Sequence, residues 1–258
     1  MKHSFLDRYS DGDSFLHRLD ARTKFIFALL FILLVVLTTP GSWFAFTLYF
    51  AVMAGLILAA KLPVGYVLRR SLAVMPFVLM IAIFVPFFKS GEVAGSYNIW
   101  LWKVTVTYSG IQVLLNILIK SWLSILSLIW LTSTTRLTHL LYALERLRFP
   151  HVLVMILSFM YRYLFVIADE MMRMKQARDS RSFGGGGLRQ LRTMGNMIGT
   201  LFIRSYERSE RVYTAMVARG FDGQARVLDT LRFKKADALF GLGLGLILIT
   251  ASTMNLLL

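Results

Sequence analysis

The sequence contains no cysteine and few acidic residues. Its 258 residues include 14 Asp and Glu and 5 Pro. Without cysteine, disulfides, thiolate metal ligands and thiol redox centres are excluded. No Ser/His/Asp grouping typical of a hydrolase is recognisable, and no short apolar segment with a small-residue cleavage site opens the chain, so we expect no cleaved signal peptide. We expect no catalytic residue and no metal site, because the histidines lie far apart: His3, His17, His139 and His151.

Apolar and basic residues are abundant instead. Hydrophobic residues make up 57% of the chain and mean hydropathy is +0.62, whereas a soluble domain is about 45–50% apolar. A membrane span needs roughly 20 apolar residues. Five runs qualify: about 24–39, 42–60, 71–88, 110–132 and 237–257. The short turn at 39–42 predicts an antiparallel helix pair, and Pro76 and Pro86 should kink or stop the third run.

The distribution of positive charge predicts the orientation. With the N-terminus inside, 26 of the 29 Lys and Arg residues fall on the cytoplasmic side, and only Lys89, Lys103 and Lys120 do not. We therefore predict an all-α, multi-pass protein of the cell membrane, with five transmembrane helices, the N-terminus inside and the C-terminus outside. The expected parts are an N-terminal segment with four helices (1–132), a cytoplasmic module (133–236) and a last helix (237–258).

One further apolar stretch, 152–168, competes as a sixth span. Arg162 stands in its middle, where a charge is costly in a bilayer. Crossing would also place the fourteen Lys and Arg residues of 169–236 outside, against the charge bias. We expect this stretch to be a helix buried against protein on the cytoplasmic side.

The cytoplasmic module is predicted to contain two long amphipathic helices that cross, joined by a hinge at Gly184 to Gly187. Apolar residues recur at alternating spacings of three and four, as in a helix-packing seam. Arg204, Arg208 and Arg211 are expected on a solvent or headgroup face. The seam residues that define the prediction are Met160, Leu164, Ile167, Met171, Met174, Ile198, Phe202 and Met216.

Both long helices end in the dipeptide Ala-Arg. The first ending is Ala177-Arg178-Asp179 and the second is Ala218-Arg219-Gly220; we call them the arginine tips. Gly220 suits the left-handed position that commonly follows a helix. A single arginine there would be explained as a helix cap. Two such endings in one module favour docking to a partner.

A polar stripe runs along the fourth apolar run. Its members recur at spacings of four, four, four and three: Gln112, Asn116, Lys120, Ser124 and Ser127. Because lipid does not tolerate such a stripe, it must face protein or water. It either contacts another membrane subunit or is hydrogen-bonded within its own bundle.

Three segments carry a family resemblance: HRLDARTKFIFALLFILLVV (17–36), EMMRMKQAR (170–178) and MVARGFDG (216–223). They resemble the transmembrane T component of energy-coupling factor (ECF) transporters, in particular the cobalt-type CbiQ. The first tip departs from the family pattern, because Asp179 stands where the family has Gly.

The resemblance implies a non-catalytic scaffold of an importer in the bacterial inner membrane. Two CbiO-like ABC ATPase subunits would receive Arg178 and Arg219 and use ATP, while this chain binds no cofactor. A CbiM-like membrane subunit, with a small CbiN-like one, would bind the substrate, and cobalt is expected over nickel or biotin. The planar guanidinium suits such docking, because it pairs bidentately with carboxylates and keeps its charge.

Other functions fit the residues less well. Nucleic-acid binding is not expected, because membrane topology explains the basic residues and the aromatics lie mostly in the apolar runs. A membrane-embedded enzyme would need two titratable groups at one depth, and Lys120 is the one ionisable residue well inside an apolar run. A stand-alone secondary transporter would show two related halves, which this chain lacks.

Overall fold

The computed structural model describes residues 12, 14–88, 93–99, 102–181, 187–223, 237–245 and 250. The chain divides into two compact units. One comprises residues 144–229, and the other comprises residues 2–143 together with 230–258. The second unit holds the helices around the hydrophobic core, and we call it the bundle.

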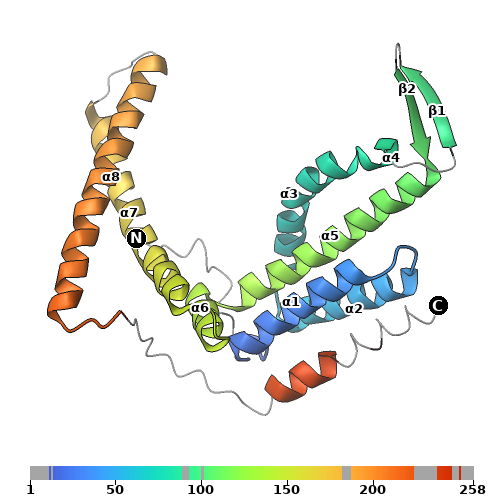
Figure 1. Ribbon diagram of the computed structural model, residues 1–258, viewed down its shortest axis with the longest axis horizontal. Helices are drawn as coiled ribbons and strands as arrows, with labels where there is room; N and C mark the ends of the chain where they lie inside the picture. The colour runs from blue at the N-terminus through green and yellow to red at the C-terminus, as the bar shows by residue number, and fades with distance from the viewer. Residues whose placement is uncertain are drawn as a thin grey trace. The chain divides into compact units, whose positions relative to one another are not determined.

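Three helices build the centre of the bundle: α1 (Ala21–Leu37), α2 (Trp43–Ala59) and α5 (Tyr108–Thr134). Helices α1 and α2 both pack against α5, along the same half of it (Figure 1). The carboxylate of Asp20 caps the start of α1 by accepting a hydrogen bond from the Arg22 amide at 2.9 Å. Gly41 has φ 103°, a left-handed conformation that glycine adopts without strain, in the turn before α2. The predicted short turn between two helices is confirmed.

Aromatic side chains fill the core between these helices. Trp130 of α5 and Tyr49 of α2 are fully buried. Phe27 of α1 meets Trp130 edge-on at a centroid distance of 5.7 Å, and Phe31 meets Tyr49 in the same way at 5.8 Å. Such edge-to-face pairs are the favoured geometry for aromatic rings. They fix α1 against both α2 and α5.

The third apolar run differs from the prediction. It is divided between α3 (Val64–Ala82) and the short α4 (Val85–Phe88). Helix α3 begins before the apolar run and therefore includes Arg70, whose guanidinium donates a 2.6 Å hydrogen bond to the Tyr66 hydroxyl. Pro76 lies inside α3, while Pro86 lies in the first turn of α4, where a proline costs no helical hydrogen bond. The predicted break of this run thus occurs just before Pro86.

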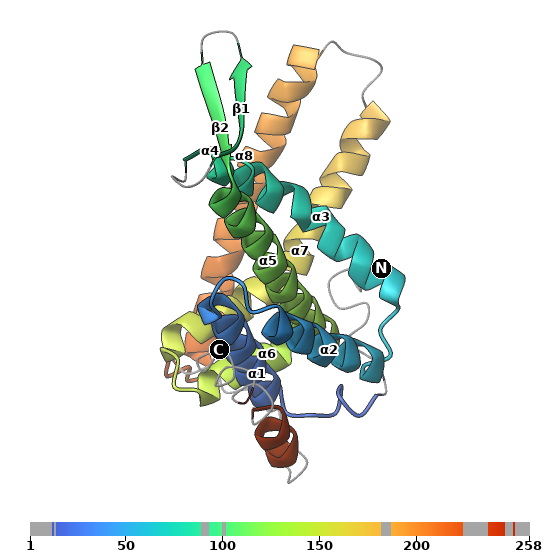
Figure 2. The ribbon, with the colours of Figure 1, turned by 90° about the vertical axis from the view of Figure 1, so that its right-hand side faces the viewer.

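A β-hairpin that the all-α prediction did not include precedes α5. Its antiparallel strands are β1 (Val93–Ile99) and β2 (Trp102–Thr107), and Figure 2 shows the hairpin extending from the start of α5. Helices α4 and α5 approach closely at this end. A Cβ added to Gly110 would lie 2.6 Å from the Pro86 Cα, so this contact requires glycine.

The described helices differ in how well they could cross a membrane. By length and composition, α3, α5 and α7 (His151–Arg181) are long and apolar enough, and α2 is a shorter apolar helix. Helix α1 has 17 residues. Of the predicted last span, 237–257, the structure describes 237–245 and residue 250. The long helix α7 includes the whole of 152–168, the stretch that competed as a sixth span. The expected burial of this stretch against protein is wrong for the chain by itself, because Val152, Leu153 and Ile156 are more than half exposed.

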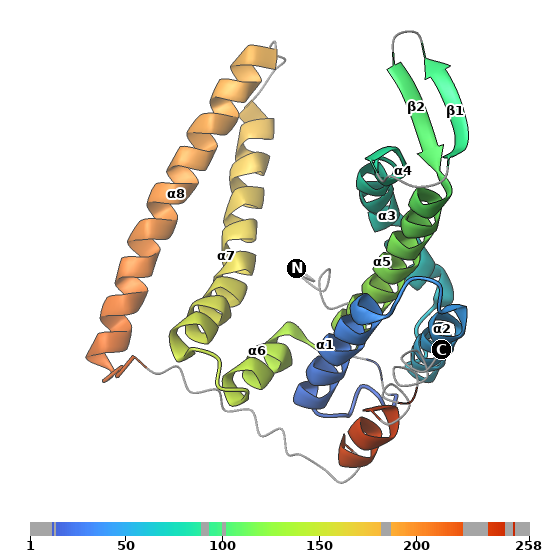
Figure 3. The ribbon, with the colours of Figure 1, turned by 45° about the vertical axis from the view of Figure 1, so that its right-hand side comes forward.

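Two long helices dominate the unit of residues 144–229. They are α7, with 31 residues, and α8 (Gly187–Ala218), with 32. The predicted pair of long helices is therefore present; residues 184–186 of the predicted hinge lie outside the described residues, and Gly187 begins α8. Arg204 and Arg211 are exposed, as predicted, and Arg204 also donates a 2.6 Å hydrogen bond to Glu170 of α7. Arg208 is half-buried, which corrects its assignment to the solvent face. Figure 3 shows that α7 and α8 run antiparallel and diverge from their connected ends.

A further helix, α6 (Leu137–Arg146), links α5 to α7 in the chain and was not foreseen as a separate element. Its central residues Leu141, Tyr142 and Ala143 are buried. Helix α6 ends with Arg148 in a left-handed conformation at φ 62°. The Arg148 amide donates to the Glu145 carbonyl and the Phe149 amide to the Leu144 carbonyl, each at 3.2 Å, which together form a Schellman cap.

Candidate functional site

The second arginine tip has a well-defined helix end. The Gly220 amide donates to the Val217 carbonyl at 2.9 Å, and the Phe221 amide donates to the Met216 carbonyl at 3.1 Å. With Gly220 at φ 79°, this is a Schellman motif, and Arg219 is its C-cap residue. The predicted left-handed glycine is confirmed. Arg219 itself is exposed, as is Ala218 before it.

The first arginine tip is built differently. Arg178 lies in the last turn of α7, which continues to Arg181, and Ala177 beside it is exposed. The Arg178 guanidinium donates two hydrogen bonds to the same carboxylate oxygen of Asp179, from Nε at 2.9 Å and from NH2 at 2.6 Å. The Arg178 side chain is 26% exposed, whereas that of Asp179 is 53% exposed. The residue that departs from the family pattern therefore partly neutralises the first tip.

The two arginine tips lie at opposite ends of the helix pair. Arg178 lies close to the connection between the helices, and Arg219 follows the far end of α8. At about 1.5 Å per residue, the 32 residues of α8 extend about 48 Å. Because α7 and α8 run antiparallel (Figure 3), most of this length separates the tips. The pair could therefore present its guanidinium groups to two separate acceptors.

The predicted seam residues are only partly covered. In α7, Met171 and Met174 are half-buried, while Met160, Leu164 and Ile167 are exposed. In α8, Met216 is half-buried, while Ile198 and Phe202 are 58% and 71% exposed. The less exposed stripe of α8 is formed by Met197, Leu201, Ser205, Arg208, Val212 and Met216. The covered face of α8 is thus displaced by one residue from the predicted seam in its first half.

The polar stripe of α5 has most of its hydrogen bonds within the bundle. Asn116 donates to the Gln112 carbonyl and Ser124 donates to the Lys120 carbonyl, each at 2.8 Å. Asn116 and Ser127 are buried, Lys120 and Ser124 are half-buried, and Gln112 is exposed. These contacts agree with the second of the two interpretations, hydrogen bonding within the bundle.

Lys120 caps the end of a neighbouring helix. Its ammonium donates to the carbonyls of Val36 at 2.9 Å and Thr38 at 2.7 Å, at the C-terminus of α1. The last carbonyls of a helix have no partner within it, and the helix dipole favours a positive charge there. Lys120 therefore lies level with the end of α1, and its charge stabilises that end.

A second lysine, which the sequence interpretation did not single out, caps α5 from the start of α1. Lys24, in the first turn of α1, is 1% exposed. Its ammonium donates to the Thr134 carbonyl at the end of α5 at 2.9 Å, and to the His17 carbonyl at 3.1 Å. Lys24 and Lys120 therefore fasten α1 to α5 at both ends. A slip of one helical turn would break both contacts.

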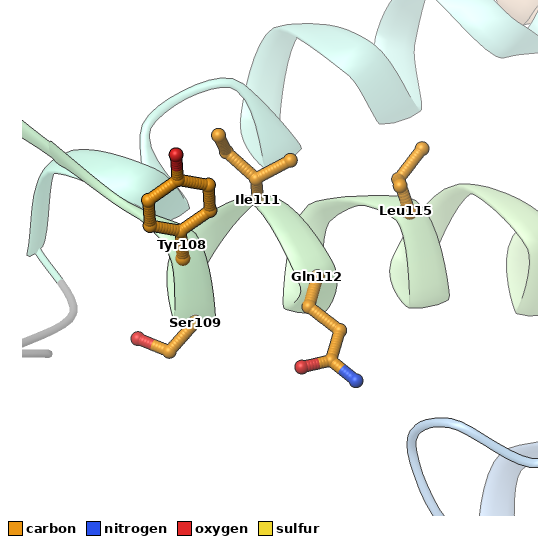
Figure 4. Close-up of a pocket in the computed structure, with 5 residues that line it drawn as sticks. All are labelled: Tyr108, Ser109, Ile111, Gln112 and Leu115. Carbon is orange, nitrogen blue, oxygen red and sulfur yellow. The ribbon is translucent and has the colours of Figure 1, made fainter. Parts of the chain in front are cut away.

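A shallow open hollow of about 490 Å³ lies along the start of α5, lined by Tyr108, Ser109, Ile111, Gln112 and Leu115. Figure 4 shows Tyr108, Ile111 and Leu115 on one side of the helix, with Ser109 and Gln112 on another. The lining contains no titratable side chain other than the Tyr108 phenol. Within the described ranges, no three His, Asp or Glu side chains gather as they would around a metal ion.

Comparisons with known proteins identify the class of this arrangement. Residues 12–228 match the CbiQ family model, described as cobalt transport protein. The chain is 30% identical to the energy-coupling factor transporter transmembrane protein EcfT of Acidaminococcus fermentans, over 92% of this chain and 91% of that protein. It is 28% identical to EcfT of Ruminiclostridium cellulolyticum, over 91% and 90% of the two chains, and 28% identical to EcfT of Brevibacillus brevis, over 84% of each.

The long apolar helices and the basic helix pair are those of a membrane transporter component. The matched residues cover most of the chain and include both arginine tips. The chain belongs to the CbiQ family, and it is the T component of an energy-coupling factor transporter.

Proposed function

We propose that this chain is the non-catalytic scaffold of a cobalt importer in the bacterial inner membrane. Two ATPase subunits of the CbiO type bind its arginine tips and hydrolyse ATP. A substrate-binding membrane subunit of the CbiM type, with a small CbiN-like subunit, binds the bundle. The chain itself binds no cofactor. The name of the matched family supports cobalt as the substrate, and nickel or biotin are the alternatives that an uptake assay would detect.

The placement of the arginine tips carries this proposal. One guanidinium lies at each end of an antiparallel helix pair, and Arg219 is exposed on a rigid Schellman cap. A scaffold that couples to two ATPase subunits requires two separated points of attachment. Arginine suits such a point, because it binds a carboxylate through two parallel hydrogen bonds. When the two ATPase subunits close, they would then apply force at both ends of the α7 and α8 helix pair.

Charge reversal at the second tip tests the coupling. We expect Arg219→Glu to abolish Co²⁺ uptake and complex-stimulated ATP hydrolysis in proteoliposomes, while the variant still inserts in the membrane. Arg211→Glu is the matched control, because Arg211 is an exposed arginine two turns earlier on α8 that makes only a weak 3.8 Å pair with Glu207. Uptake by Arg219→Glu at the level of this control would refute the docking role.

The proposed topology has five spans, with α7 and α8 on the cytoplasmic side. Because the chain has no cysteine, a single introduced cysteine can be labelled without background. We expect Tyr108→Cys to react with a membrane-impermeant maleimide in intact cells, and Val217→Cys to react only after permeabilisation. Labelling of Val217→Cys in intact cells would show that α7 crosses the membrane and would overturn the five-span topology.

A further inference from the structure

Four charged residues gather where α1 begins, α5 ends and the helical segment 237–245 begins. Asp20, Lys24 and Asp237 are 3%, 1% and 2% exposed, and Arg22 completes the group. We call these four residues the charged joint. Arg22 is half-buried, with its side chain 27% exposed. The two positive and two negative charges balance, so that the three buried charges are compensated.

The contacts of the charged joint connect segments that are far apart in the sequence. The Asp20 amide donates a 2.8 Å hydrogen bond to Asp237 Oδ1, which ties the start of α1 to the segment 237–245. Lys24 Nζ donates to the Thr134 carbonyl at the end of α5, and the carboxylates of Asp237 and Asp20 both attract its charge. Three segments of the bundle are thus held at one point.

The charged joint also reaches α6, the helix that precedes the α7 and α8 pair in the chain. The Arg22 guanidinium lies over the ring of Tyr142 at 5.4 Å from its centroid, and Arg22 Nε lies 3.8 Å from Asp20 Oδ1. Tyr142 is buried in α6. Thr134 is the last residue of α5 and Tyr142 lies within α6. The charged joint therefore contacts the chain on both sides of the connection between these two helices.

Among the described residues, several buried polar atoms near the charged joint make no hydrogen bond within the chain. At the joint itself or beside its partner Thr134, they are Asp20 Oδ2, Arg22 Nε, Thr23 Oγ1, Ser133 Oγ and Thr135 Oγ1. Buried polar atoms in folded proteins are almost always hydrogen-bonded, and each exception needs a reason. The hydroxyls on both sides of Thr134 and the second carboxylate oxygen of Asp20 are therefore available as new hydrogen-bond partners when the connection moves.

We infer that the charged joint is a movable anchor, with Lys24 as its positioning residue, through which motion of α6 and the helices after it is passed to the bundle. In the arrangement described here, Lys24 holds the Thr134 carbonyl. When α6 shifts, the unpaired hydroxyls and Asp20 Oδ2 take over hydrogen bonds that the shift breaks. The coupling part of this inference rests on the proposed function.

The anchor itself is tested on the isolated chain in nanodiscs, by hydrogen–deuterium exchange. We expect Lys24→Met to speed amide exchange in residues 135–143 about 10-fold, the order of factor that follows from losing one charged hydrogen bond. Lys175→Met, which alters an exposed lysine of α7, should leave that exchange unchanged. Equal exchange in Lys24→Met and the wild type would overturn the anchor, whatever the function of the chain.

A double variant separates positioning from charge balance. Lys24→Met with Asp237→Asn removes one charge of each sign, so the joint stays neutral and the chain should regain wild-type thermal stability. In proteoliposomes with the ATPase and substrate-binding subunits, we expect near wild-type ATP hydrolysis but Co²⁺ uptake at least about 10-fold lower, equivalent to about 1.4 kcal/mol. If the double variant recovers both uptake and thermal stability, Lys24 only balances charge and does not position α6.

The two proposals fail in different ways. If the wild-type complex shows no ATP-dependent uptake, the proposed function is wrong, while the exchange measurement still decides whether Lys24 anchors the connection. If the wild type transports and the double variant transports equally, the inference is wrong and the proposed function stands.

Discussion

The cap that Lys120 provides for α1 yields a quantitative prediction. Lys120→Met keeps a side chain of similar length but removes both hydrogen bonds, to the Val36 and Thr38 carbonyls. A hydrogen bond from a charged donor contributes about 1.5–3 kcal/mol. Because the lysine also gives up hydration, and the two bonds share one ammonium, we expect a net loss of about 2–4 kcal/mol. For a chain of this size, that loss lowers Tm by about 5–15 °C.

Intrinsic tryptophan fluorescence during heating in detergent micelles measures this shift, because Trp130 lies in the core beside α1. Lys175→Met serves as the control, since it removes an exposed lysine, and its Tm should change by less than about 1 °C. A shift as small as this in Lys120→Met would refute the cap and show that water replaces the ammonium at the end of α1.

Three further predictions concern single positions. Gly110→Val should lower Tm, at a cost of about 1–3 kcal/mol, because its Cβ would meet the Pro86 backbone, whereas Gly55→Ala in open space should not. Arg148→Gly should raise stability by about 1 kcal/mol in thermal denaturation, because it relieves a left-handed arginine; an unchanged Tm would argue against strain there. Asp179→Asn should strengthen binding of the ATPase subunits about 2- to 5-fold in a titration at low salt, by releasing Arg178, and a salt-independent gain would contradict this.

Hydrophobic runs and their spacing predicted most of the helical architecture. The turn before α2, the long α5 and the pair α7 and α8 follow from apolar length and period alone. The start of α3 was misplaced because Arg69 and Arg70 were counted as loop residues, although a helix can extend beyond its apolar run. The β-hairpin had a visible signal, the alternation of Val and Thr in residues 104–107, which the emphasis on membrane spans obscured.

The phase of the helix seam was harder to predict. Helix α8 carries apolar residues at neighbouring positions, such as Met197 beside Ile198 and Leu201 beside Phe202. Two stripes one residue apart therefore fit the period equally well, and only packing against α7 distinguishes them. The sequence does place both arginine tips correctly at helix ends, but it cannot show that Asp179 occupies the Arg178 guanidinium.

Long-range polar contacts were beyond a single sequence. Lys24 was counted among the cytoplasmic charges that set the orientation, yet its partner Thr134 lies 110 residues away. The same holds for Lys120, whose partners Val36 and Thr38 are more than 80 residues distant. Lys24 lies at the edge of an apolar run, where a lysine is usually a flanking charge, so its sequence position alone did not suggest a buried helix cap.

The unequal lengths of the packed helices have a consequence for the surrounding lipid. Helices α1 and α2, with 17 residues each, extend about 26 Å, whereas the 27 residues of α5 extend about 40 Å. These lengths lie on either side of the roughly 30 Å hydrocarbon thickness of an average bilayer. Lipid next to the shorter helices adapts by thinning, and lipid next to α5 adapts by thickening, unless α5 tilts. Any rearrangement of α5 against α1 thus changes the elastic energy of the lipid annulus, and acyl-chain length should influence how readily it occurs.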